Sequence, residues 1–195
     1  MFRRVTLLAS DLEASRRFYE TVLPTRGIED WPDFAIEQAD GEVTTGLHIG
    51  FTAPSRAEVD EFWRAGTAAG YRDDGPPGPR PVYGGDYYGG FLLDPDGNSA
   101  EGVHFDGVRS DGIVDHVWIR VADVAASRAF YAELAPRAGF RLNDRPNRAQ
   151  FAGVSGSFSV LEGEPSRHVR MAFPTSGPAA ELTDPDGNVV ELVPG

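Results

Sequence analysis

The sequence predicts an α+β protein made of four successive modules, each with the order strand, helix, strand, strand, strand, and with the last module shortened. Two internal repeats support this prediction. The segment ASDLEASRRFYETVL at residues 9–23 recurs as VADVAASRAFYAELA at residues 121–135, and the pentapeptide DPDGN occurs at residues 94–98 and 184–188. Because self-similar segments indicate a repeated structural unit, the chain consists of two related halves. The two motifs lie closer together in the second half, which is therefore the shorter one.

The first module, residues 2–45, begins with an alternating strand, RRVTLLA, and continues into an amphipathic helix. The apolar side chains that recur at helical spacing are Leu12, Phe18, Tyr19 and Val22. Asp11 or the residue before it is expected to cap this helix, because a short polar side chain there accepts a hydrogen bond from an unpaired backbone N–H group. The third module, residues 112–163, repeats the pattern with the strand DHVWIRV and the second FY helix.

The second module, residues 46–105, opens with the strand TGLHIGFTA. The helix that follows begins with Ser55 and Glu58, which have the spacing of a capping box, and ends at Gly70. The Gly/Pro-rich segment at residues 73–90 is predicted to be a surface loop. A functional alternative is a lid that covers a pocket with its three tyrosines, Tyr83, Tyr87 and Tyr88.

The fourth module, residues 166–194, opens with SRHVRMAF, but PTSGPAA stands where a helix is expected. This module has therefore lost its helix. The short polar segment DGVRSDG separates the two halves, which predicts a first domain at residues 1–105 and a second at residues 112–195.

The two DPDGN segments are predicted to be turns between strands. Proline sets the second position of a turn, and glycine takes the left-handed conformation that closes it. A calcium loop of the EF-hand type needs oxygen ligands out to a twelfth position, whereas strand-like sequence follows each pentapeptide here.

Composition excludes several classes of function. A net charge of -12 disfavours nucleic acid as a partner. The apolar run near the N-terminus is too short for a signal peptide or a membrane span, so a cytoplasmic protein without membrane contact is expected. Because the chain has no cysteine, thiol catalysis is excluded and any metal must be bound by histidine and carboxylate side chains.

The strand and FY-helix openings, the segment HIGFTAPSRAEVDEF and the DPDGN turn followed by a strand glutamate resemble the vicinal oxygen chelate superfamily. This is the glyoxalase, bleomycin-resistance and extradiol-dioxygenase group. The resemblance covers nearly the whole chain. It implies that pairs of modules curl into two cup-shaped mixed sheets, and that the function is isomerase, lyase, thiol-transferase or dioxygenase chemistry or metal-free drug binding.

The resemblance also implies where metal ligands lie, namely on the first strand of each module and on the strand after the DPDGN turn. The first-strand positions are Arg4, His48, His116 and either Arg170 or His168, and the last-strand positions are Glu101 and Glu191. Strand alternation supports this independently, because it places the two module-opening histidines, His48 and His116, opposite the apolar residues that face the helices. His104 does not fit this pattern and is expected to be exposed.

Two pairings of the modules are open. If consecutive modules pair, neither cup holds a complete set of ligands. If module two pairs with module three, as the resemblance to glyoxalase I and fosfomycin-resistance enzymes implies, then His48, His116 and Glu101 converge on a site for Fe(II), Mn(II), Ni(II) or Zn(II). The other cup would then be degenerate, with too much positive charge for a cation; its residues are Arg4, His168, Arg170 and Glu191.

The favoured function is a metal-dependent enzyme that acts on a small oxygen-chelating substrate, with Glu101 and Tyr88 taking part in the chemistry. Glu37 is a further candidate base by its position in the family. The alternative is a protein that sequesters a cationic drug without metal, using the acidic charge and the aromatic faces of Trp31, Trp118, Tyr87 and Tyr88. A structural or regulatory protein is a third reading. The open edge left by the fourth module predicts a homodimer.

Overall fold

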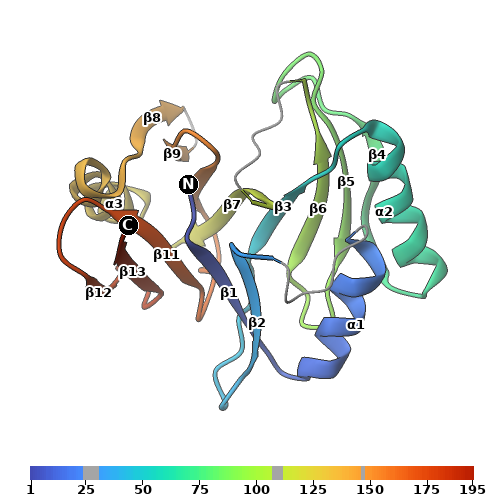
Figure 1. Ribbon diagram of the computed structural model, residues 1–195, viewed down its shortest axis with the longest axis horizontal. Helices are drawn as coiled ribbons and strands as arrows, with labels where there is room; N and C mark the ends of the chain where they lie inside the picture. Colours follow the sequence, from blue (N-terminus) through green and yellow to red (C-terminus); the bar gives the residue numbers. More distant parts are fainter. Residues whose placement is uncertain (24–30, 107–111, 146–147) are drawn as a thin grey trace.

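A computed structural model describes residues 1–23, 31–106, 112–145 and 148–195 of the chain, and it confirms the α+β class (Figure 1). The helices in these residues are α1 (Leu12–Val22), α2 (Arg56–Ala68) and α3 (Val124–Ala138). The strands form two mixed sheets.

The smaller sheet has five strands in the order β12-β13-β11-β1-β2. Its members are β1 (Arg4–Ala9), β2 (Phe34–Gln38), β11 (Arg170–Thr175), β12 (Ala180–Thr183) and β13 (Val189–Pro194). The larger sheet has eight strands in the order β4-β5-β6-β3-β7-β10-β9-β8. Its members are β3 (His48–Thr52), β4 (Arg72–Pro79), β5 (Tyr88–Leu93), β6 (Ser99–His104), β7 (Val114–Val121), β8 (Arg141–Arg145), β9 (Arg148–Ala152) and β10 (Ser157–Glu162).

Strand pairing decides between the two arrangements of modules. β3 of the second module pairs antiparallel with β7 of the third, and β1 of the first pairs antiparallel with β11 of the fourth. Modules two and three therefore share the eight-stranded sheet. The division of the chain into two domains, at residues 1–105 and 112–195, remains a prediction. Each of the two sheets contains strands from both of these ranges.

The first and the fourth modules are both shorter than a full module. The fourth has three strands and no helix, as expected, since residues 176–179 connect β11 directly to β12. The first has one helix and two strands in its described part, where four strands were predicted, and residues 24–30 lie outside that part. Residues 39–47 lead from β2, which pairs with β1, to β3, and they form an isolated bridge between Thr45 and Arg167.

The segment at residues 73–90 was wrongly predicted to be one loop. β4 reaches Pro79 and β5 starts at Tyr88, so only residues 80–87 connect strands. The prolines are tolerated because β4 is an edge strand with irregular register, where a missing N–H group removes no bond inside the sheet.

The repeated motifs are joined by buried hydrogen bonds. The hydroxyl of Tyr19 on α1 donates to Asp94 of the first DPDGN turn at 3.2 Å, and Tyr131 on α3 donates to Asp184 of the second at 2.8 Å. Asn98, the last residue of the first turn, accepts from the backbone N–H of Leu47 at 3.1 Å. The DPDGN turns are confirmed as turns, and the first one fixes the start of β3 beside β6.

The helices cover one face of the sheets and leave the other face open. α1 and α2 pack together on the right of Figure 1, where α2 contacts β5 and β6, while α3 lies on the left against β8, β9 and β10. Ile49 and Phe51 of β3, and Leu47 just before it, are almost fully buried in the core, as strand alternation predicted. The intervening residues of β3, including His48, therefore face the concave side.

Candidate metal centre

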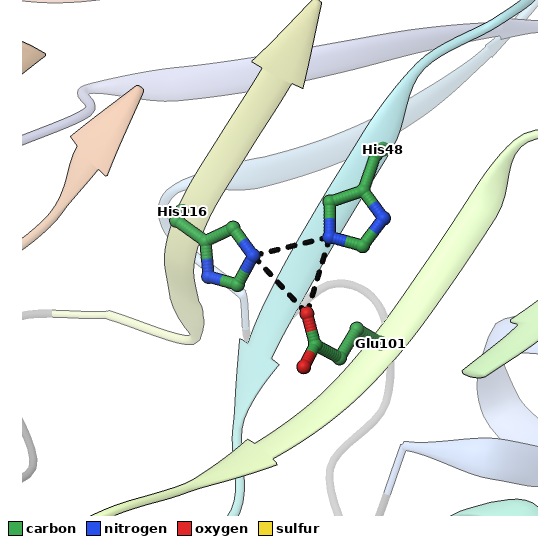
Figure 2. A group of neighbouring side chains, drawn as sticks. All are labelled: His48, Glu101 and His116. Carbon is green, nitrogen blue, oxygen red and sulfur yellow. Dashed lines mark hydrogen bonds and ion pairs between the residues drawn. The ribbon is translucent and has the colours of Figure 1, made fainter. Parts of the chain in front are cut away.

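His48, Glu101 and His116 converge on the concave face of the eight-stranded sheet, from β3, β6 and β7 (Figure 2). The Nε2 atoms of both histidines lie 3.1 Å from Oε2 of Glu101 and 3.1 Å from each other. Ligands at about 2.1 Å from one ion and at right angles to each other lie about 3.0 Å apart. The spacing of the three donor atoms therefore fits three ligands of one divalent metal ion.

Strand register explains why these three side chains meet. Gly50 is the direct neighbour of Glu101 on β6 and of His116 on β7. A side chain at Gly50 would overlap the imidazole of His116, so the absence of a Cβ atom here makes room for the ring. Gly89 on β5 makes the same kind of room for the carboxylate of Glu101.

We expect Gly50→Ala to destabilise the protein by about 1–3 kcal/mol, the usual cost of forcing an extra methyl group into a packed site. The free energy of unfolding in urea measures this. Gly85→Ala is the control, because a methyl group at Gly85 meets no atom within 4 Å. Equal stability of the two variants would contradict the close approach of His116 to β3.

The charges of the cluster are coupled. Burial tends to raise the pKa of Glu101, but the hydrogen bonds from His116 and His48 outweigh it and lower the pKa to about 2. Burial opposes the charge on His116, yet Asp115 and Glu101 raise its pKa to about 9. For His48 burial dominates and lowers the pKa. Without metal at neutral pH, the cluster therefore holds an ionised Glu101, a protonated His116 and a neutral His48.

Asp115 contacts the cluster and was not among the site residues predicted from the sequence. Its Oδ1 atom accepts a hydrogen bond from Nδ1 of His116 at 2.9 Å, and both side chains are buried. Neighbouring residues of a regular strand point to opposite faces. The register of β7 shifts here, since Gly50 pairs with His116 while Phe51 pairs with Val114, and this bulge allows Asp115 to reach its neighbour. A carboxylate bonded to the far nitrogen orients a metal-binding imidazole.

Tyr87, and not Tyr88, contacts the cluster. The hydroxyl of Tyr87 donates to Oε1 of Glu101 at 2.9 Å. Tyr88 points to the helix face, where its hydroxyl donates to Asp60 of α2 at 2.7 Å. The prediction of a role for Tyr88 beside Glu101 was wrong, because consecutive residues at the start of β5 alternate between the two faces.

Aromatic side chains line the open space next to the cluster. Two cavities of about 190 and 420 Å³ share Tyr83, Tyr87 and Trp118 in their walls. The guanidinium of Arg148, in the wall of the smaller cavity, lies 4.7 Å from the centre of the Trp118 ring. Two of the three tyrosines in the predicted lid thus border the cavities. Trp31 does not, since it is buried in the core 5.8 Å from the Phe34 ring.

The second predicted cup corresponds to a cavity on the five-stranded sheet, but its lining residues differ in part from those predicted. Arg4, Arg170, Glu191 and Glu37 line a cavity of about 540 Å³ on the five-stranded sheet. His168 is not in its wall. This residue has a left-handed backbone with φ 54, and its Nδ1 atom lies 3.5 Å from the exposed Glu42. His104 lies on the helix face and bonds the carbonyl of Ala53 at 3.0 Å.

Strand-helix modules paired across a curved sheet are the architecture of the vicinal oxygen chelate class of proteins. The family Glyoxalase/Bleomycin resistance protein/Dioxygenase superfamily matches residues 2–101, and the chain belongs to this superfamily.

Two solved structures share the fold over almost the whole chain. Glyoxalase I from Zea mays is 18% identical with a TM-score of 0.68, and the alignment covers 99% of this chain and 92% of the other. A putative dioxygenase from Bacillus subtilis is 10% identical with a TM-score of 0.64, covering 98% and 84%. No curated protein matches the chain significantly. In the described ranges, no helix has both the length and the apolar composition for a membrane crossing.

Proposed function

We propose that the chain is a divalent-metal-dependent enzyme that acts on a small substrate with two adjacent oxygen atoms. The observation that carries this proposal is the convergence of the Nε2 atoms of His48 and His116 and a carboxylate oxygen of Glu101, all within 4.8 Å of one another. Two imidazoles and one carboxylate suit Fe(II), Mn(II), Ni(II) or Zn(II). Bound there, the metal would supply Lewis acidity toward the substrate oxygens.

Internal symmetry argues for three protein ligands and not four. Around the β3–β7 pair, His48 and His116 occupy equivalent positions, and Glu101 lies opposite Gly50 as Ser159 lies opposite Trp118. A serine therefore stands where a second glutamate would complete the set. An ion held by three protein ligands would keep coordination positions open for a substrate. This supports lyase, isomerase or dioxygenase chemistry.

The remaining residues of the site have positioning roles in this proposal. Asp115 holds the Nδ1 proton of His116, so that Nε2 faces the ligand position. The hydroxyl of Tyr87 fixes Glu101 and is the nearest described side-chain donor to it besides the histidines. Trp118 and Tyr83 offer faces for a planar substrate, and Arg148 beside them favours an anionic group on it.

Metal analysis tests the proposal. Protein purified without chelators is expected to carry close to one equivalent of divalent metal, and His116→Ala is expected to lose it. His104→Ala is the matched control, because this histidine is bound to Ala53 on the opposite face of the sheet and should leave the metal content unchanged. Metal retained by His116→Ala would contradict the site. The loaded protein would then be screened for turnover of compounds with oxygens on adjacent carbons.

The aromatic walls also suit the alternative, a protein that sequesters a drug without metal. Its expected ligand is cationic, and the guanidinium of Arg148 in the cavity wall opposes this charge. Absence of metal together with saturable binding of a cationic aromatic compound would favour sequestration over catalysis. We further propose a cytoplasmic protein that forms a homodimer, which size-exclusion chromatography with light scattering would test.

A further inference from the structure

The five-stranded sheet repeats the register that builds the candidate metal centre. In the larger sheet His48 pairs with Trp118, and Gly50 pairs with His116. In the smaller sheet Arg4 pairs with Ala172, and Thr6 pairs with Arg170. Arg4 and Arg170 are thus diagonal neighbours across an antiparallel pair, in the same relation as the two histidines. Side chains in this relation are close enough to meet over one point.

Because arginine replaces histidine at both positions, the smaller sheet offers hydrogen-bond donors and positive charge where the larger sheet offers metal ligands. An imidazole offers a lone pair to a metal ion, whereas a guanidinium has five N–H donors, no acceptor and a permanent positive charge. Two guanidinium groups over one point therefore exclude a cation. Their donors match the oxygens of a carboxylate or a phosphate, which they bind in pairs.

The guanidinium groups are available for a ligand. Arg3, Arg4 and Arg170 line the cavity of about 540 Å³, and none of their guanidinium groups makes a hydrogen bond or ion pair with any described residue. Arg4 and Arg170 are exposed. This is a local excess of positive charge in a chain whose net charge is -12.

In the five-stranded sheet an alanine, and not a carboxylate, takes the place that corresponds to Glu101. Ala35 lies opposite Thr6, which is the place that Glu101 takes opposite Gly50 in the larger sheet. Glu191 lies opposite Ala172 of β11, the place that Ser159 takes opposite Trp118 in the larger sheet, and Glu37 lies two residues beyond Ala35 on β2. With three arginines and these two glutamates in its wall, the cavity keeps a net positive charge.

We propose that the five-stranded sheet holds a second ligand site, in which Arg4 and Arg170 bind a small oxyanion, either a carboxylate or a phosphate. The site is independent of metal at the first cup, since the two clusters lie on different sheets. It takes a different class of ligand from the proposed metal centre.

Isothermal titration calorimetry with inorganic phosphate and with succinate, at matched ionic strength, tests this proposal and separates the two oxyanions. We expect saturable binding of one of them with one site per chain. Arg4→Gln and Arg170→Gln should each weaken it at least about tenfold, because each removes charged hydrogen bonds to the ligand. Arg170→Lys should weaken it less, since it keeps the charge and loses only the paired donors.

Two control variants distinguish anion binding at this site from a general effect of positive charge and from an effect of the metal centre. Arg141→Gln removes one exposed positive charge from the other sheet and should leave the affinity unchanged. His116→Ala should also leave it unchanged, so failure of the metal proposal does not affect this one. No saturable binding of either anion, binding that survives both Gln substitutions in folded protein, or loss of binding in His116→Ala would each overturn the proposal.

Discussion

Glu101→Gln is expected to lower the affinity for Mn(II) more than about 100-fold. Loss of a hydrogen-bonded partner behind a metal ligand typically costs about 10- to 100-fold, so the loss of the ligand's own charge costs more. Glu101 is the one carboxylate of the three-residue cluster, and it is buried, with 2% of its surface exposed. The amide keeps the size of the side chain and limits any effect on folding.

The measurement is a titration with Mn(II) of protein from which metal has been removed. Glu162→Gln is the control, because this glutamate is exposed at the end of β10 in the same sheet. Its affinity for Mn(II) should equal that of the unaltered chain. If Glu101→Gln binds Mn(II) as tightly as the control does, the three side chains are not the ligands.

The affinity for Mn(II) is also expected to rise with pH, by about tenfold per unit from pH 7 to about pH 9, and then to level off. Metal binding requires a neutral imidazole, and the pKa of His116 is raised to about 9, so below that pH the metal must displace one proton. His48 adds nothing to this slope, because its pKa is lowered and it is already neutral at pH 7. Glu101 is ionised throughout, since its pKa is about 2.

Calorimetry in buffers of different ionisation enthalpy measures the released proton directly, and one proton per metal is expected at pH 7. Asp115→Asn provides a second check. It removes a carboxylate that supports the charge on His116, so the pKa of His116 should fall and the plateau should begin at a lower pH. If the affinity of the unaltered chain for Mn(II) does not depend on pH, His116 is not protonated in the metal-free cluster and the assigned protonation states are wrong.

Much of the candidate site follows from local patterns in the sequence. Alternation along β3 predicted that His48 lies on the face opposite Leu47 and Ile49, and the structure confirms it. The predicted capping residues are also confirmed, since Asp11 accepts from the backbone N–H of Ala14 and Ser55 from that of Glu58. The same local reasoning chose Tyr88 as the tyrosine beside Glu101, whereas Tyr87 contacts Glu101. Neighbouring residues face opposite sides of a sheet, and the sequence did not show which of the two tyrosines faces the cavity.

By itself, the sequence determined the periodicity of strands and helices, the turns at DPDGN and the loss of the fourth helix, because residues a few positions apart decide these features. Only the tertiary structure decided that β3 lies beside β7, that a bulge turns Asp115 toward His116, and that Arg170 and not His168 takes the fourth first-strand position. These relations join residues far apart in the chain, and they depend on how whole sheets bury their apolar faces against the helices. The pattern of residues within a single strand or helix therefore does not show which strands of different modules pair.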